Sequence, residues 1–121
     1  MGSGNAWVNY ALFGVAAAFL LQRVLAGISA RRRIPEILAR GAPIIDVRSP
    51  GEFAAGHASN SRNIPLADLE TGAEELNRSQ WVIVCCASGA RSSAARRLLL
   101  RHGFTRVLNA GSWRNLPART L

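Results

Sequence analysis

A long apolar segment near the N-terminus leaves room for only one soluble domain in this chain of 121 residues. Residues 6–28 read AWVNYALFGVAAAFLLQRVLAGI, and only Asn9, Gln22 and Arg23 in them are strongly polar. The segment is long enough to cross a bilayer as a helix, which takes about 20 residues. Trp7 suits one membrane interface, and the long side chain of Arg23 can reach the other. We therefore predict a transmembrane helix at 6–28, with the lipid bilayer as its partner.

Basic residues follow this apolar segment and none precedes it. The short tail at 1–5, MGSGN, has no basic side chain, whereas a basic linker at 29–34 contains three consecutive arginines. A signal peptide carries its positive charge before the apolar run, so the pattern favours a retained anchor. By the positive-inside rule, the anchor crosses the inner (cytoplasmic) membrane once and leaves the following domain in the cytoplasm. A cleaved signal peptide and a soluble amphipathic helix are the alternatives.

The remaining residues, 35–121, have the length and composition of one soluble domain. Short apolar runs predict strands at 43–48, 63–65, 81–86 and 106–109. The signals for helices lie between them, at 50–56, 66–76 and 92–103, the first with Ser49 as N-cap and Pro50 at its first position. Strands that alternate with helices at short spacing predict an α/β fold with a central parallel sheet flanked by helices.

The charge of the chain suggests anionic partners, because fifteen arginines, no lysine and seven carboxylates give a formal charge of +8. The arginines are scattered and no basic stripe is interleaved with aromatic residues, so no nucleic acid is expected. Two adjacent cysteines do not make a disulfide framework, which favours a reactive thiol or a reducing compartment. The two cysteines and two histidines lack the spacing of metal ligands, so no metal is expected.

The stretch from Cys86 to Arg91 joins a predicted central strand to a helix, at the sheet edge where parallel α/β proteins bind ligands. Its small residues let backbone N–H groups turn inward, and with the helix N-terminus they form a nest for an anion. The predicted binding loop consists of Ala87, Ser88, Gly89, Ala90 and Ser92. Such a setting lowers the pKa of a cysteine, and Arg91 adds a permanent charge. A plain strand-to-helix turn with a buried thiol is the alternative.

Four motifs together resemble a single-domain rhodanese, a sulfurtransferase, over roughly residues 28–111. They are IIDVRSPGEFAAGH, NIPL, CASGARS and GFTRVLNAG, in the family's order and spacing. The resemblance implies a central parallel sheet flanked by helices, and a Cys86 that accepts a sulfane sulfur as a covalent persulfide. The implied donor is thiosulfate or another persulfide, and the acceptor is a thiol, a protein or another nucleophile. Beyond that persulfide no cofactor is implied, and Cys86 and Arg91 are the expected catalytic residues.

Two other functions stay open at this point: a non-catalytic rhodanese-like module that binds a partner at the membrane, and a phosphatase or arsenate reductase of the same fold. The phosphatases and reductases generally have five residues between cysteine and arginine, whereas this chain has four, which favours sulfur transfer. The segment ASNSRN at 58–63 and the shortened ending AGSWRNLPARTL depart from the family pattern. They put the rim of the pocket, and with it the substrate, in doubt.

Two further predictions concern polar and thiol side chains near this loop. Asp46, Arg48, Glu52 and His57 are expected to form a structural polar cluster beneath or beside it. Cys85 continues the apolar run Val82-Ile83-Val84 and is expected to be a buried strand residue with a raised pKa. This leaves Cys86 as the nucleophile.

Overall fold

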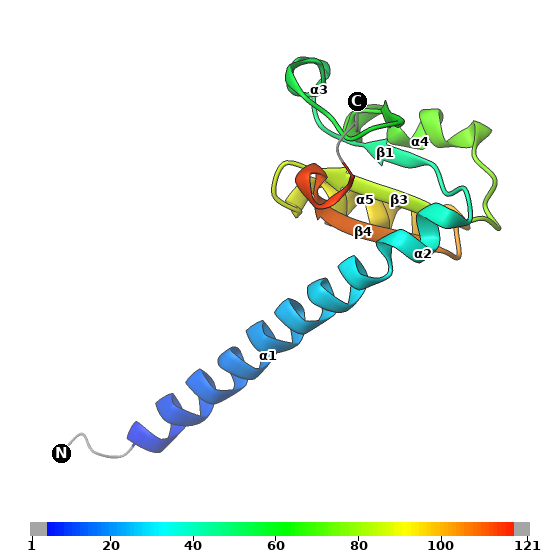
Figure 1. The fold of residues 1–121 in the computed structure, drawn as a ribbon. Coiled ribbons are helices and arrows are strands. Elements are labelled where there is room, and N and C mark those ends of the chain that lie inside the picture. The colour runs from blue at the N-terminus through cyan, green and yellow to red at the C-terminus, as the bar shows by residue number, and fades with distance from the viewer. Residues whose placement is uncertain (1–4, 118–121) are drawn as a thin grey trace.

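In the part of the chain that the structure describes, a long N-terminal helix is followed by a sheet of four parallel strands (Figure 1). The computed structural model describes residues 5–117, so most of the predicted tail at 1–5 and the last four residues of the predicted domain lie outside the described residues. The order of the strands is β2-β1-β3-β4. Their bounds are Ile44–Asp46 for β1, Ser61–Asn63 for β2, Val82–Cys86 for β3 and Val107–Ser112 for β4. The predicted α/β fold with a parallel sheet is confirmed.

Helices precede the sheet and connect its strands. The α-helices are α1 at Ala6–Arg32, α2 at Ile34–Ala39, α3 at Pro50–Ala55, α4 at Leu69–Gly72 and α5 at Ala90–Arg101. Within residues 5–117, three short 3-10 helices lie at Leu66–Asp68, Ala73–Glu75 and Trp113–Asn115. The connection predicted as one helix at 66–76 is therefore three short turns. Gly72 lies in their middle, where a Cβ would come within 2.7 Å of Ile64, so only glycine lets the segment pack this closely.

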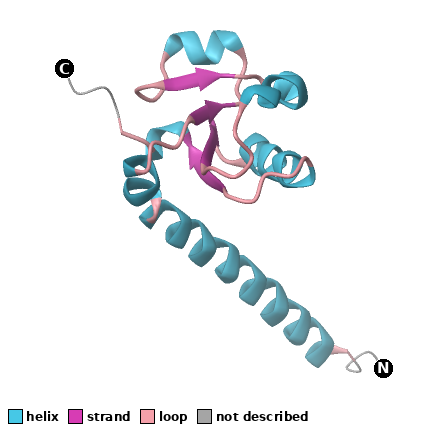
Figure 2. Cartoon of the chain, turned by 90° about the vertical axis from the view of Figure 1, so that its right-hand side faces the viewer, coloured by secondary structure: helices cyan, strands magenta, loops and turns pink. Residues whose placement is uncertain are grey.

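The sheet is covered on both faces (Figure 2), which explains why β3 is apolar throughout. Val82, Val84 and Cys86 belong to the core under α4 and α5. Ile83 and Cys85 belong to a second core that includes Ile34 and Ile37 from the α2 region. Because side chains alternate along a strand, the two adjacent cysteines enter different cores.

The helix α1 is by far the longest of the described helices, and none of its residues is buried. Its 27 residues extend about 40 Å, and they continue as helix through most of the predicted basic linker. By length and composition, the helical stretch Ala6–Ala39, of which α1 is the larger part, is the one candidate membrane span among the described residues, with a mean hydropathy of 1.9 over its most apolar window. Its large apolar side chains, such as Phe13 and Leu20, are exposed.

The predicted strand at 63–65 begins two residues earlier, as β2 at Ser61–Asn63. Pro65 has no N–H to donate to a neighbouring strand, so it stands outside the ladder. The side-chain amide of Asn63 instead donates to the backbone oxygens of Asp46 and Arg48, at 3.0 and 2.9 Å. These two hydrogen bonds connect the end of the edge strand β2 to the end of β1.

Candidate active site

The loop from Cys86 to Arg91 turns the chain from the end of β3 into α5. Gly89 has a φ of +112°, a left-handed conformation that glycine adopts without strain. A Cβ at this position would lie 3.7 Å from the Cα of Gly111, which belongs to the neighbouring strand β4. That distance is an ordinary contact, so it is the left-handed φ, and not a lack of space, that favours glycine where the loop folds back over the cysteine.

The sulfur of Cys86 is enclosed by this loop, and the side chain is only 1% exposed. The backbone N–H of Gly89 donates to Sγ at 2.9 Å, and the thiol lies 3.4 Å from the Oγ of Ser92. Burial by itself raises the pKa of Cys86, but hydrogen bonds from Ser92 and from the amides of Gly89 and Ser88 outweigh it and hold the pKa below its ordinary value. The loop thus stabilises a thiolate.

The predicted loop residues do not all act on the sulfur. Ser88, Gly89 and Ser92 hydrogen-bond to it, whereas Ala90 begins α5 and Ala87 is a small residue in the turn. The hydroxyl of Ser92 accepts from the Cys86 thiol and donates its own proton to the backbone oxygen of Gly89 at 3.1 Å, which holds the turn closed.

Arg91 forms a two-pronged ion pair with Glu52, which lies 39 positions earlier in the chain. Its two terminal nitrogens lie 2.6 and 2.9 Å from the two carboxylate oxygens, and both side chains are half-exposed. The Arg91 guanidinium lowers the pKa of Glu52 to about 2, against the opposing effect of burial, and Ser49 contributes further. Ser49 and Glu52 also cap α3 reciprocally. Glu52 therefore joins α3 to the first turn of α5.

Asp46 and Arg48 form a second ion pair, which is buried. The guanidinium of Arg48 lies 2.7 Å from the carboxylate of Asp46, and these residues are 4% and 0% exposed. Arg48 also donates to the backbone oxygen of Gly56 at 2.7 Å and lies 4.9 Å from the ring centre of Trp113. All these contacts connect segments of the scaffold, and none reaches the sulfur of Cys86.

The four residues predicted as one polar cluster thus separate into three parts: Asp46 and Arg48 pair with each other, Glu52 pairs with Arg91, and His57 stands apart. Arg48 touches Glu52 only through the backbone oxygen of Glu52, at 3.3 Å. The exposed ring of His57 stacks on Phe53 with the ring centres 3.8 Å apart, and its Nδ1 lies 2.8 Å from the backbone oxygen of Phe53. His57 therefore lies against α3, because the preceding helical turn offers it both a ring and a carbonyl.

Cys85 lies on the opposite face of the sheet from Cys86 and is fully buried. Its surroundings are apolar, except for Asp46, which pairs with Cys85 in the register of β1 and β3 and holds Arg48. Burial raises the pKa of Cys85 to about 12, and the carboxylate of Asp46 adds to the effect. A thiol with such a pKa is protonated at neutral pH and is a poor nucleophile.

Several residues that support the site had no recognisable signal in the sequence. Trp113 covers Arg48, and Asn109 on β4 donates to Ser93 on α5 at 3.0 Å. A bulge brings Gly111, with a φ of +72°, opposite Cys85. In the departing segment ASNSRN, Arg62 is exposed on the edge strand β2. No group of three or more metal-type ligands occurs among residues 5–117.

Comparison with known proteins matches this chain to proteins with a rhodanese-like domain. Residues 31–115 match the model of the rhodanese-like domain. The chain is 32% identical over 109 residues to the uncharacterized protein YqhL of Bacillus subtilis, covering 84% of this chain and 86% of that protein. It is 30% identical to the thiosulfate sulfurtransferase GlpE of Pseudomonas aeruginosa, covering 75% and 87%. The human single-domain sulfurtransferase TSTD1 superposes with a TM-score of 0.62 at 30% identity, covering 69% of this chain and 88% of that structure.

The matched residues contain all four strands and the whole loop from Cys86 to Arg91. The share of the relatives that is covered leaves no large part of GlpE or TSTD1 without a counterpart here. The chain belongs to the rhodanese-like family and has sulfurtransferases among its homologues.

Proposed function

We propose that this protein transfers a sulfane sulfur through a persulfide on Cys86. The observation that carries the proposal is the enclosure of the Cys86 sulfur by Ser92 and by the amides of Gly89 and Ser88, which lowers the pKa of this thiol. The pKa of the adjacent Cys85 is raised instead, so the thiol of Cys85 stays protonated. The thiolate, which a lowered pKa favours, is the species that attacks sulfur. The sulfurtransferases among the relatives support the same reaction class.

The reaction needs no external oxidant or reductant. In the first half, the Cys86 thiolate attacks the outer sulfur of thiosulfate, a new S–S bond forms, and the old S–S bond breaks with its electron pair leaving on sulfite. In the second half, an acceptor thiolate attacks the outer sulfur of the persulfide and releases Cys86 as a thiolate. In both forms of the protein, the free Cys86 thiolate and the Cys86 persulfide, a negative sulfur lies in or next to the loop, where the backbone N–H groups stabilise it.

The burial of Cys86 supports a small donor. A side chain that is 1% exposed can be reached only by a narrow, terminal sulfur atom, which thiosulfate or an extended persulfide presents. The four-residue loop also disfavours the phosphatase alternative. Its Gly89 N–H already points at Sγ, so this amide is not directed at an oxyanion bound above the sulfur.

Mass spectrometry of the protein after thiosulfate treatment tests this reaction. We expect a peptide that contains both cysteines to gain one sulfur atom, and fragmentation to place that atom on Cys86. Treatment with a thiol such as dithiothreitol should then remove it. A protein that gains no sulfur would support the non-catalytic module, and sulfur on Cys85 would contradict the assignment of the nucleophile.

We further propose that α1 anchors the domain in the inner membrane with the domain in the cytoplasm. The exposed apolar surface of α1 and the arginines at its C-terminal end support this orientation. A reporter fused after the C-terminal residue should behave as cytoplasmic, and periplasmic activity would reverse the assignment. Deleting residues 1–28 should release a soluble domain that still reacts with thiosulfate, because Ala30 and Ile34, which pack in the core, remain.

A further inference from the structure

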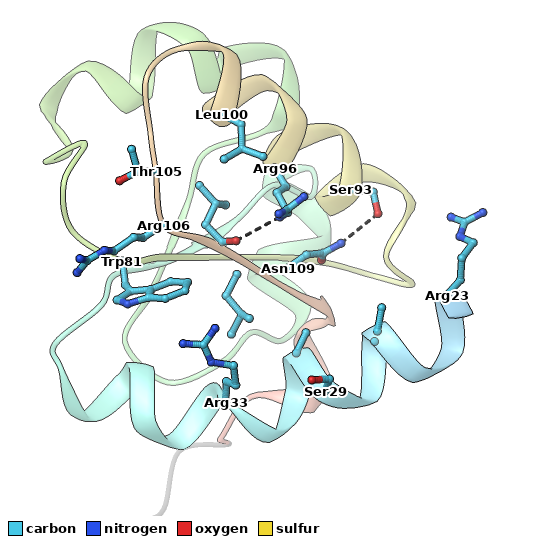
Figure 3. A pocket seen from close by; sticks show the side chains of 15 residues that line it. Arg23, Ser29, Arg33, Trp81, Ser93, Arg96, Leu100, Thr105, Arg106 and Asn109 are labelled. Atoms are coloured by element: carbon cyan, nitrogen blue, oxygen red, sulfur yellow. Dashed lines mark hydrogen bonds between the residues drawn. The ribbon is translucent and has the colours of Figure 1, made fainter. Parts of the chain in front are cut away.

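A groove separates the last turns of α1 from β4 and α5 (Figure 3). Its cavity has a volume of about 660 Å³. The wall from α1 carries small residues, among them Gly27, while the polar side chains come from both sides. We call it the juxtamembrane groove and define it by the six side chains Arg23, Arg33, Ser93, Arg96, Arg106 and Asn109.

The groove is strongly cationic, because four arginines and no acidic residue are among the described residues that line it. Two of its donors are held in place by hydrogen bonds to the wall. Nε of Arg96 donates to the backbone oxygen of Val107 at 3.2 Å, and Asn109 donates to Ser93. Arg33 lies over the ring of Trp81, 4.9 Å from its centre. A concave site lined by four arginines and no carboxylate matches a phosphate group.

The groove continues toward the candidate active site. Two adjoining cavities, of about 370 and 540 Å³, also contain Arg23, Gly27 and Asn109. Both reach Ser88 of the loop that follows Cys86. A ligand in the groove would therefore lie beside the active-site loop and would hold it close to α1.

The level of the groove along α1 identifies the source of the phosphate. About 20 residues cross the hydrocarbon core, so a span that starts near Trp7 ends near Ala26. The groove occupies α1 from Arg23 to Arg33, which is the level of the headgroups on the side of the domain. Resting on the anchor of the proposed function, we propose that the juxtamembrane groove binds the phosphate of an anionic phospholipid headgroup.

The test is lipid retention by the full-length protein in nanodiscs that contain equal parts of phosphatidylcholine and phosphatidylglycerol. Native mass spectrometry should find phosphatidylglycerol retained in preference to phosphatidylcholine. Replacing Arg96 and Arg106 by glutamine should reduce this preference by roughly tenfold. The matched control, Arg62→Gln with Arg101→Gln, removes the same charge from outside the groove and should keep the preference.

A second pair of variants keeps every arginine. A Cβ at Gly27 meets no atom within 4 Å, so Gly27→Leu puts an apolar side chain into the groove and should also remove the preference. Gly14→Leu adds the same side chain to an equally open position of α1 at a distance from the groove, and it should behave as the wild type. This pair covers the case in which the arginine variant fails to fold.

The outcomes separate this inference from the anchor. If the wild-type protein does not enter the nanodiscs, the anchor itself is wrong. If it enters but the Arg96/Arg106 and Gly27 variants keep the wild-type preference, the groove inference alone is overturned. If millimolar sn-glycerol 3-phosphate or inorganic phosphate removes the preference, the groove is a site for soluble phosphate, and the lipid source is overturned.

Discussion

Cys85 and Cys86 are neighbours in the chain, yet they lie on opposite faces of the sheet and in opposite chemical surroundings. Cys86 meets the N–H groups of a turn, and the pKa of its thiol is lowered. Cys85 meets an apolar core, and the pKa of its thiol is raised to about 12. The strand puts them on different faces because side chains alternate along it. One residue of offset is enough to separate a thiol with a lowered pKa from a thiol with a raised one.

Each thiol also has an arginine–carboxylate pair nearby, and the two pairs differ in how far they are exposed to solvent. Arg48 and Asp46, on the Cys85 side, are buried and bonded to the scaffold. Arg91 and Glu52, at the Cys86 loop, are half-exposed. The Asp46–Arg48 pair is out of reach of solutes, so its contacts are structural. The Glu52–Arg91 pair is accessible to an anion from solution.

The largest effect is expected from Cys86→Ser. A serine hydroxyl remains protonated in the same loop, so we expect sulfur transfer to fall by roughly 1000-fold or more. Sulfite release from thiosulfate, with dithiothreitol as acceptor, measures the rate, and circular dichroism checks the fold. A variant that still releases sulfite at the wild-type rate would mean that the chemistry does not depend on this loop.

Asp46→Asn tests the buried pair. The substitution leaves the guanidinium of Arg48 buried without its counter-charge, which costs about 3–5 kcal/mol in the free energy of unfolding. Denaturant unfolding in detergent gives the value. The double variant Asp46→Asn with Arg48→Met removes both charges and should recover part of the loss. A loss below 1 kcal/mol would mean that this pair behaves like a surface pair.

Glu52→Gln tests the exposed pair through its pH dependence. The pKa of Glu52 is about 2 in the folded protein, below its ordinary value of 4.5, so the ion pair stabilises the fold above pH 4.5. This contribution is lost as the pH falls from 4.5 toward 2, because the carboxylate of the folded protein then becomes protonated.

The measurement is the difference in Tm between wild type and Glu52→Gln across this pH range. We expect the wild type to be more stable at pH 6 and the difference to shrink between pH 4.5 and 2. Glu36→Gln is a suitable control, because Glu36 forms an exposed pair with Arg40 away from the loop. A difference that does not change with pH would show that Glu52 acts only as the cap of α3.

The smallest effect is expected from Cys85→Ala. Its thiol behaves as a small apolar group in the core, so the loss should be about 1 kcal/mol of stability, with most of the sulfur transfer retained. Denaturant unfolding and sulfite release are measured together. An inactive Cys85→Ala beside an active Cys86→Ser would reverse the assignment of the two cysteines.

Much of the fold could be predicted because its signals are local. The apolar run at Val82–Cys86 is a buried strand, and Ser49 followed by Pro50 starts α3 as predicted. The small residues after Cys86 predict a turn before a helix, which the structure contains. In each case, residues close in the chain determine the backbone conformation by themselves.

Contacts between distant segments could not be predicted in this way. The sequence placed Glu52 with Asp46, Arg48 and His57 on the strength of one motif, but the structure pairs it with Arg91 and leaves His57 stacked on Phe53. A side chain pairs with whichever group the fold brings within reach, and that depends on how α3 and α5 lie over the ends of the strands.

The sequence by itself therefore determined the apolar N-terminal helix, the parallel α/β fold, and a cysteine at the start of a small-residue turn. Only the tertiary structure decided which amides reach the Cys86 sulfur, which carboxylate holds Arg91, and that the end of α1 faces β4 across a cationic groove. The physical reason is range: hydrophobic periodicity and turn chemistry act over a few residues. Ion pairs and grooves arise only after packing has brought remote residues together.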